Sequence, residues 1–217
     1  MSRYEPLKIT AWLRCGVITD THLPIDAILF YSAMAQLNGP QLVTLPGRNP
    51  DAKAASLPLK HVEMNGVWFH AASFAQWGPH ADGQAFWTKR FDQKSAHLID
   101  FHGRRGKVIV EQGRYKAYRM PVFYRHALWV SWYVVGNYIA IQRLLAPMTH
   151  IGKKTAQGFG RVIRWDVEPW DHDWSVYGPD GRLMRAIPER GGILYGIRPS
   201  YWDRRNQVPC RLPEQGN

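Results

Sequence analysis

Glycine and basic residues are concentrated in one short run of this chain, from Ile151 to Val162. The run contains three glycines, two lysines and an arginine without an acid: Gly152, Lys153, Lys154, Gly158, Gly160 and Arg161. Glycine permits positive φ and close approach to a ligand, exposed amides can bind an anion, and lysine adds positive charge. This combination predicts a loop that binds phosphate groups.

The spacing of the glycines excludes two common nucleotide-binding motifs. No Gly-Lys-Ser/Thr follows Gly152 after a four-residue spacer, so the run is not a Walker loop. Gly158 and Gly160 follow at intervals of six and two residues, and the next segment has the pattern of a strand instead of a helix. The dinucleotide-binding fingerprint requires a different spacing and a helix at that point.

The loop contains groups that can bind the phosphates and the bases of an RNA strand. Gly158 and Gly160 would let the RNA approach the backbone, Lys153 and Lys154 would neutralise phosphates, and Phe159 could stack on a base. The other residues predicted to contact RNA here are Gly152, Gln157, Arg161 and Arg164. The alternative is an ordinary basic turn with Phe159 in the core.

A second basic region extends from Ala85 to Arg125, where ten lysines and arginines stand against three acids. Predicted strands at Lys107–Glu111 and Tyr115–Tyr124, joined around Gly113, indicate a basic hairpin that projects from the core. Aromatic residues lie among the cations, a mixture that favours single-stranded nucleic acid, although a charged run can also be a solvated face. The predicted contacts with RNA, or with target DNA beside it, are Arg104, Arg105, Lys107, Arg114, Lys116 and Arg119.

Catalysis is the alternative to binding, and His22 is the sharpest candidate for a general base. Metal-free RNA cleavage needs a base for the 2′-hydroxyl, an acid for the leaving oxygen and a cation, and His22, Tyr31 and Lys154 could supply them. A histidine beside a helix start is more often a capping or packing residue, so we expect no catalytic residue. Cys15 and Cys210 are far apart and form no metal motif, and no cofactor or metal is expected.

The overall composition favours a folded protein that attracts polyanions. Hydrophobic residues make up 45% of the 217 residues, and 28 Lys and Arg against 17 Asp and Glu give a formal charge of +11. The longest apolar run, Ala127 to Ile141, is too short to span a membrane, and residues 1–6 lack the pattern of a signal peptide. Nucleic acid is therefore the expected partner, no membrane is expected, and a cytoplasmic location follows by default.

Hydrophobic periodicity and turn residues predict the order of elements. Strands are expected at Leu7–Cys15, Gly66–Phe74, Leu128–Val135, Arg161–Val167 and Tyr195–Arg198, and helices at Pro24–Gln36 and Asn137–Leu145. Residues 40–60 are expected to be a loop, and Pro179-Asp180-Gly181 a turn in a second hairpin. This order predicts an α+β fold with a ferredoxin-like βαββαβ core. We expect one domain over 1–217, with the basic hairpin inserted at 85–125 and an extension at 169–217.

Two segments of this sequence resemble the RAMP superfamily, the RNA-binding subunits of CRISPR effector complexes. One is the Gly-rich basic loop between the second helix and the last core strand, Gly152 to Arg161. The other is Leu23 to Tyr31, which is similar to the start of the first helix in several of these proteins. Size, charge and the basic insertion look most like the type IV subunit that is equivalent to the Cas-five family.

The resemblance implies a non-catalytic subunit of a type IV CRISPR ribonucleoprotein that holds the 5′ handle of the crRNA. Its implied partners are crRNA, backbone and large subunits, and target DNA near the flanking duplex motif. A crRNA-processing endoribonuclease of the same superfamily, a nucleic-acid-binding module outside CRISPR and an unrelated basic metabolic enzyme are the alternatives.

Overall fold

The structure is a computed structural model that describes residues 4–20, 22–39, 55–100 and 106–214. Its centre is a four-stranded antiparallel sheet with the order β4-β7-β1-β8. These strands are β1 (Glu5–Leu13), β4 (Gln76–Trp77), β7 (Trp129–Gly136) and β8 (Val162–Pro169). The strands predicted at Leu7–Cys15, Leu128–Val135 and Arg161–Val167 are therefore present with small shifts of their ends.

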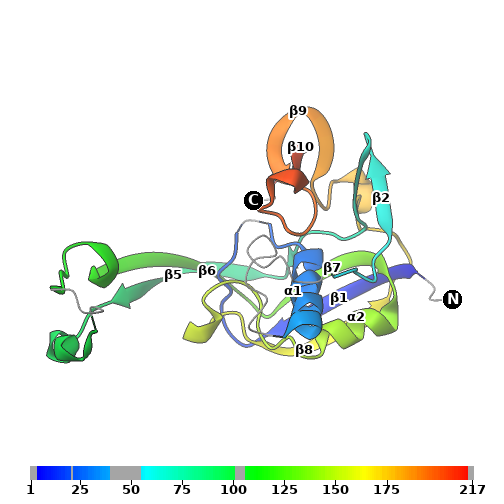
Figure 1. Cartoon of the computed structure of the whole chain (residues 1–217). Coiled ribbons are helices and arrows are strands. Elements are labelled where there is room, and N and C mark those ends of the chain that lie inside the picture. The colour runs from blue at the N-terminus through cyan, green and yellow to red at the C-terminus, as the bar shows by residue number, and fades with distance from the viewer. Residues whose placement is uncertain (1–3, 21, 40–54, 101–105, 215–217) are drawn as a thin grey trace.

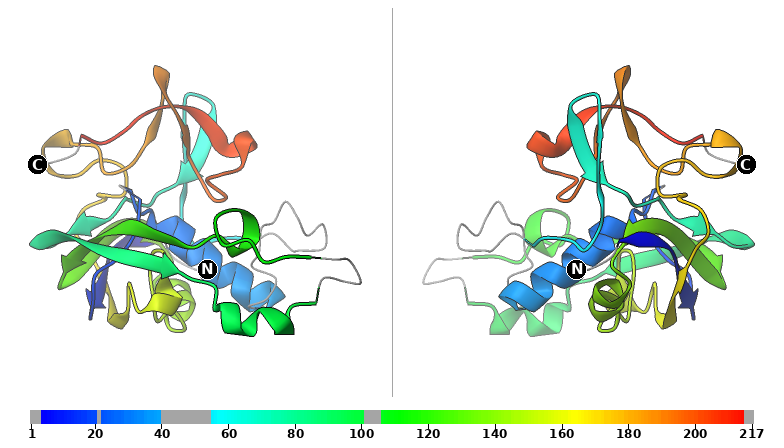
Figure 2. Two further views of the ribbon diagram at one scale, coloured as in Figure 1. Left: turned by 90° about the vertical axis from the view of Figure 1, so that its left-hand side faces the viewer. Right: turned by 90° about the vertical axis from the view of Figure 1, so that its right-hand side faces the viewer.

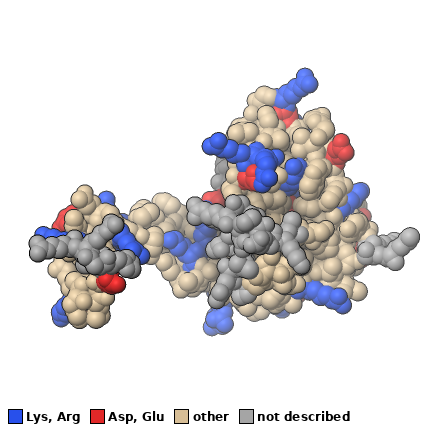
Figure 3. Space-filling view, in the orientation of Figure 1, with Lys and Arg blue, Asp and Glu red and all other residues tan. Residues whose placement is uncertain are grey.

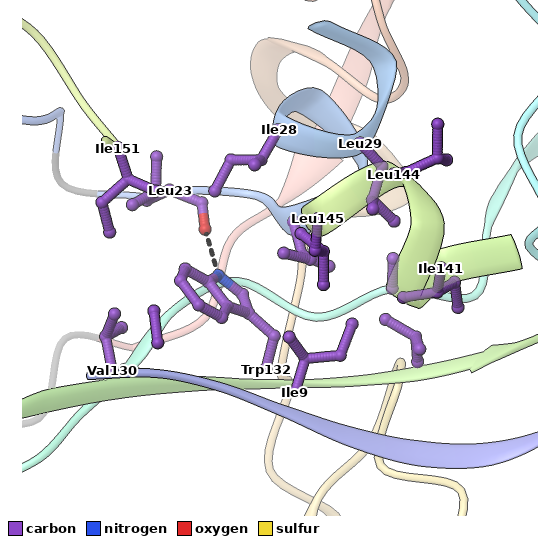
Figure 4. Packing of buried hydrophobic residues seen from close by; sticks show 14 of the residues in the cluster. Ile9, Leu23, Ile28, Leu29, Val130, Trp132, Ile141, Leu144, Leu145 and Ile151 are labelled. Atoms are coloured by element: carbon purple, nitrogen blue, oxygen red, sulfur yellow. Dashed lines mark hydrogen bonds between the residues drawn. The ribbon is translucent and has the colours of Figure 1, made fainter. Parts of the chain in front are cut away.

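Two helices cover one face of this sheet, α1 (Ile25–Asn38) and α2 (Tyr138–Leu145) (Figure 1). Alternate residues of β1, such as Ile9, are buried against the helices together with Leu29 of α1 and Ile141 of α2. Trp132 of β7 lies at the centre of this cluster and donates a hydrogen bond of 2.8 Å to the Leu23 carbonyl (Figure 4). This bond satisfies the indole N–H, which would otherwise be costly to bury.

Local sequence explains where α2 begins and ends. The Asn137 side chain accepts a hydrogen bond from the Ala140 amide at 2.9 Å, as expected for a helix N-cap. Pro147 follows the last turn and cannot continue the helix. The resulting arrangement is mixed α/β with mostly antiparallel strands, which is consistent with the predicted ferredoxin-like fold.

A long hairpin projects from the sheet and forms an arm, made of β5 (His80–Lys89) and β6 (Tyr118–Ala127) (Figure 1). The basic hairpin was predicted with the wrong strands, because residues 107–111 form no strand and β6 pairs with β5. The described residues 90–100 and 106–117 lie at the tip of the arm, which includes the short 3₁₀ helices η1 (Gln93–Leu98) and η2 (Gly113–Tyr115). The arm is largely exposed on both faces, so β5 lacks the apolar alternation that would predict a strand.

A second group of strands lies above α1 and the central sheet in the view of Figure 1, and Figure 2 shows the same arrangement from two further sides. It contains the hairpin of β2 (His61–Met64) and β3 (Val67–His70) and the pair β9 (Ile187–Gly196) and β10 (Gln207–Arg211). The strand predicted at Gly66–Phe74 is thus only β3, and Tyr195–Arg198 is the end of β9 followed by a further strand. The turn at Pro179–Gly181 is present as η4; the remaining 3₁₀ helices are η3 (Thr155–Gln157) and η5 (Arg204–Asn206).

A buried arginine holds this second group together. Arg185 is fully buried, with its guanidinium 4.6 Å from the Phe69 ring, and it donates hydrogen bonds to the carbonyls of His70, Ala72 and Ile197. A buried charge is tolerated when its donors are satisfied in this way. Most of the predicted loop at 40–60 lies outside the described residues, and its described part, 55–60, contains no helix or strand.

Asp26 of α1 connects the first helix with the C-terminal strands. Its carboxyl is fully buried and accepts a 2.6 Å hydrogen bond from the Tyr201 hydroxyl. Burial raises the pKa of Asp26, and the nearby Arg185 charge opposes that rise. Asp26 follows Pro24 and Ile25 in the helix start that carried the family resemblance, so in this chain that motif has a structural role.

Candidate nucleic-acid interface

The Gly-rich loop between α2 and β8 is fixed at its base by backbone hydrogen bonds. The Ile151 amide donates to the Gly160 carbonyl at 2.8 Å, and the Gly160 amide donates to the Gly16 carbonyl at 2.9 Å. The Lys153 amide donates to the Ile18 carbonyl at 2.6 Å. The loop therefore closes on itself and on the segment after β1, which leaves its middle exposed to solvent.

The three glycines of the loop have different roles. All three have positive φ, from 71° at Gly160 to 89° at Gly158. A side chain at Gly160 would collide with the Ile151 carbonyl, and one at Gly152 would lie 2.5 Å from the Ile18 carbonyl. Only Gly158 is open, so its exposed backbone remains available to a ligand, whereas Gly160 is buried and its missing side chain makes room for the protein itself.

The two lysines of the loop differ in their contacts. Lys153 forms an exposed ion pair with Asp20, with an Nζ to Oδ1 distance of 2.6 Å. Lys154 has a left-handed backbone, and its Nζ lies 3.3 Å from the centroid of the Trp87 ring on β5. The predicted phosphate-binding loop and the predicted basic hairpin are thus in direct contact.

Phe159 makes the second contact between the loop and the arm. Its ring centroid lies 5.7 Å from that of Tyr124 on β6, and both side chains are half-buried. Phe159 is therefore neither in the main core nor free in solvent. Cys15 fixes the backbone on both sides of Phe159, because its thiol donates to the Gly158 carbonyl at 2.9 Å and accepts from the Arg161 amide at 3.2 Å.

The register of the arm places aromatic and basic side chains on both of its faces. Trp87 pairs with Met120, and Gly83 with Tyr124, so these residues share the face that meets the loop. The opposite face carries Phe86, with the Arg119 guanidinium 3.9 Å from its ring centroid, and the exposed Phe123. Figure 3 shows basic side chains along the arm with few acidic ones beside them.

Sequence reasoning missed Trp87, Tyr124 and Cys15 as parts of the loop's surroundings. Trp87 was one of several aromatics in the basic region, and nothing in the local pattern singles it out. The pairing with Lys154 depends on how the loop after α2 packs against β5 of the arm, which is a feature of tertiary structure.

The remaining predicted RNA contacts fall in three places. Gln157 and Arg161 are exposed in or beside the loop, and Lys107, Arg114 and Lys116 are exposed at the tip of the arm. Arg104 and Arg105 lie outside the described residues. Arg164 lies on β8, where its guanidinium is 4.7 Å from the Trp12 ring centroid and its Nε is 3.2 Å from the Asp166 carboxylate.

The three residues considered for catalysis are not joined by any contact among the described residues. His22 stacks on Phe74 with a centroid distance of 4.7 Å, and burial lowers its pKa. Tyr31 is exposed on α1, and Lys154 is engaged with Trp87. Across the described ranges, no group of three or more His, Cys, Asp or Glu side chains could hold a metal ion, and no helix is long and apolar enough to cross a membrane.

A comparison with protein families assigns this chain to a family of CRISPR-associated proteins. The chain matches the family described as "CRISPR type IV associated protein Csf3" over residues 5–213, and it belongs to that family. The expected kinship with type IV CRISPR-associated proteins is therefore confirmed. A search of curated protein sequences found no match.

A similar chain occurs in a solved structure titled "Cryo-EM structure of the Type III-B Cmr-beta bound to cognate target RNA". The two chains share 11% sequence identity with a TM-score of 0.36, over 77% of this chain. This chain matches only 61% of that chain, less than two thirds of its length.

Proposed function

We propose that this protein is a non-catalytic RNA-binding subunit of a type IV CRISPR ribonucleoprotein and holds the 5′ handle of the crRNA. The RNA lies at the junction of the Gly-rich loop and the arm. The observation that carries this proposal is the contact between Lys154 and Trp87, which joins a phosphate-binding element to an aromatic one. Membership of the Csf3 family supports the CRISPR context.

The chemistry of the junction suits a single strand. The exposed backbone at Gly158 and the Lys153 and Lys154 ammonium groups would meet phosphates, while Trp87 and Phe159 offer ring surfaces for bases. Base stacking on such rings contributes about 1–3 kcal/mol per base, and each neutralised phosphate adds a salt-dependent contribution. Binding of this kind requires no bond making and no metal.

The surfaces outside this junction would contact other components of the complex. The opposite face of the arm, with Phe86, Arg119 and Phe123, is free to meet neighbouring backbone and large subunits or target DNA near the flanking motif. In such assemblies guide pairing performs the sequence search, and protein subunits recognise backbone shape.

The experiment that tests the proposal is purification of the complex with its RNA. We expect a discrete RNA of guide length to co-purify with this protein, and its 5′ end to be protected from nuclease. The double variant Lys154→Ala with Trp87→Ala should lose that protection. Recovery of no RNA, or of RNA whose protection is unchanged in the variant, would contradict the proposal.

Endoribonuclease activity is the rival, and it needs a separate test. We expect repeat RNA incubated with the purified protein in EDTA to remain intact, because His22 is packed on Phe74 and none of its described contacts is with Tyr31 or Lys154. Specific cleavage that disappears in His22→Ala would establish the enzyme instead.

A further inference from the structure

A cavity of about 830 Å³ lies beside the root of the arm. Its walls come from the end of the turn after β1, from β4, from the base of both arm strands, from the η4 turn and from the chain around the end of β10. In Figure 1 this region lies between the arm and the C-terminal strands. Sites for small molecules typically measure about 300–1,000 Å³, so the cavity has the size for one nucleotide.

Three arginines line the cavity. Arg125 of β6 is held by the Asp82 carboxylate, at 3.0 Å from its Nε and 3.3 Å from its Nη2, and its guanidinium lies 5.5 Å from the Trp77 ring centroid. Arg211 pairs with Glu189 at 2.9 Å, whereas Arg182 makes no ion pair among the described residues. The other titratable groups of the wall are His22, His80, Asp180 and Glu214.

Aromatic rings form the other part of the wall. His22 stacks on Phe74 with an interplanar angle of 24°, and Trp77 completes the surface. Burial lowers the pKa of His22, so its imidazole is neutral near pH 7 and presents a flat ring with hydrogen-bonding nitrogens. Flat rings beside arginine guanidinium groups match the two parts of a nucleotide, its base and its phosphate.

The segment after β1 joins the Gly-rich loop to Arg125 in the wall of the cavity. Val17 exchanges backbone hydrogen bonds of 2.8 and 2.9 Å with Arg125, and Ile18 accepts from the Lys153 amide. One short segment therefore touches the loop on one side and the root of the arm on the other. An RNA strand that extends from the loop past this segment would therefore reach the cavity.

A smaller cavity between α2 and β8, of about 380 Å³, lacks this combination. Its lining is mostly apolar, and Arg164 is its one cation among the described residues. The one aromatic residue in its described lining, Trp165, donates its indole N–H to the Met148 carbonyl, and Arg164 is paired with Asp166, so both are engaged within the protein.

We infer that the larger cavity binds one extruded nucleotide of the single-stranded RNA, with its base on His22 and Trp77, the His22 ring being backed by the buried Phe74, and its phosphate at Arg182. This inference rests on the proposed function, since the RNA must first occupy the adjacent loop. His22 thus has the role of a binding surface in place of a general base.

Photo-crosslinking tests the inference. The probe is a pool of short single-stranded RNAs of random sequence that contain 4-thiouridine, which forms bonds with nearby side chains on irradiation. Peptide mapping should find cross-links on His22 or on the segment Phe74–Trp77, besides those on the loop. Arg182→Glu should abolish these cavity cross-links and leave those on the loop.

Arg143→Glu is the matched control, because Arg143 is exposed on α2 and lines neither the cavity nor the loop. It should leave both sets of cross-links in place. His22→Ala should weaken RNA binding by about fivefold or more, the equivalent of one lost stacking contact.

The outcomes separate the inference from the function on which it rests. RNA that binds and cross-links only to the loop and arm would overturn the nucleotide site and leave the proposed function intact. Cavity cross-links that survive in Arg182→Glu would overturn the assigned phosphate contact. A protein that binds no RNA would overturn both.

Discussion

The Nζ atom of Lys154 lies 3.3 Å from the centroid of the Trp87 ring. This contact joins the Gly-rich loop to the arm and holds a cation directly over an aromatic face. A cation in this position is attracted by the ring and loses conformational freedom before any ligand arrives. The pair therefore presents a fixed positive charge and an aromatic ring at one place on the surface.

The first prediction concerns this pair. Lys154→Ala and Trp87→Ala should each weaken binding of single-stranded RNA, and Trp87→Ala by about fivefold or more if a base stacks there. The double variant should lose less RNA-binding free energy than the sum of the two single losses, because the two residues act as a unit. Fluorescence anisotropy with a labelled RNA measures all three. Lys60→Ala, an exposed lysine beside the β2–β3 hairpin, is the control, and an equal loss there would show a general charge effect.

A second prediction concerns Asp20, which pairs with Lys153 on the exposed surface. Asp20→Asn should raise RNA affinity at low salt, because it removes a carboxylate that competes with phosphate. Lys153→Ala should lower affinity and reduce the slope of log affinity against log salt by about 0.7, the value for one phosphate contact to a single strand. The free energy of unfolding of both variants should lie within about 1 kcal/mol of the wild-type value, as expected for an exposed ion pair. An unchanged salt slope in Lys153→Ala would exclude this lysine as a phosphate contact.

The third prediction compares two glycines of the same loop. Gly158→Ala should lower the free energy of unfolding by about 1–2 kcal/mol, the cost of a left-handed conformation for a residue with a side chain. Gly160→Ala should cost about 1–3 kcal/mol more, because its side chain would collide with the Ile151 carbonyl and disturb buried hydrogen bonds. Urea denaturation measures the difference. Equal losses at the two positions would contradict the described loop geometry.

The fourth prediction concerns His70, whose pKa is lowered to about 3 by burial first and then by the charges of His61, Arg185 and Arg198. The folded protein keeps this imidazole neutral, while the unfolded chain protonates it near pH 6.5. Its contribution to stability is therefore complete above pH 6.5 and is lost as the pH falls toward 3, by about 1.4 kcal/mol per pH unit.

Replacement of His70 tests this dependence. His70→Gln should show a shallower loss of stability between pH 6.5 and 5 than the wild type, by about one proton. The free energy of unfolding in urea at several pH values measures the slope. His22 remains in both proteins, so its own lowered pKa contributes equally. Parallel curves for the two proteins would show that His70 does not titrate on unfolding.

Local sequence was sufficient for the elements that bury a regular apolar pattern. The alternation in β1, the apolar run of β7 and the Asn137 cap of α2 each predicted an element close to its observed bounds. The strands of the arm were harder to predict from the sequence, because β5 is exposed on both faces and its residues follow no apolar period. The predicted partner, Lys107–Glu111, contains valine and isoleucine and looks more like a strand, yet β6 pairs with the segment before the tip.

The sequence by itself determined which residue types make up the candidate site. These are three glycines with lysines in one loop, and a basic region rich in aromatic residues. Composition and spacing are sufficient for this, because both are properties of residues that are neighbours in the chain. Only the tertiary structure decided that Lys154 meets Trp87, that Gly160 makes room for Ile151, and that Arg125 and Arg182 line one cavity with His22. These relationships arise from packing between segments distant in sequence, and no local pattern carries the information that brings such segments together.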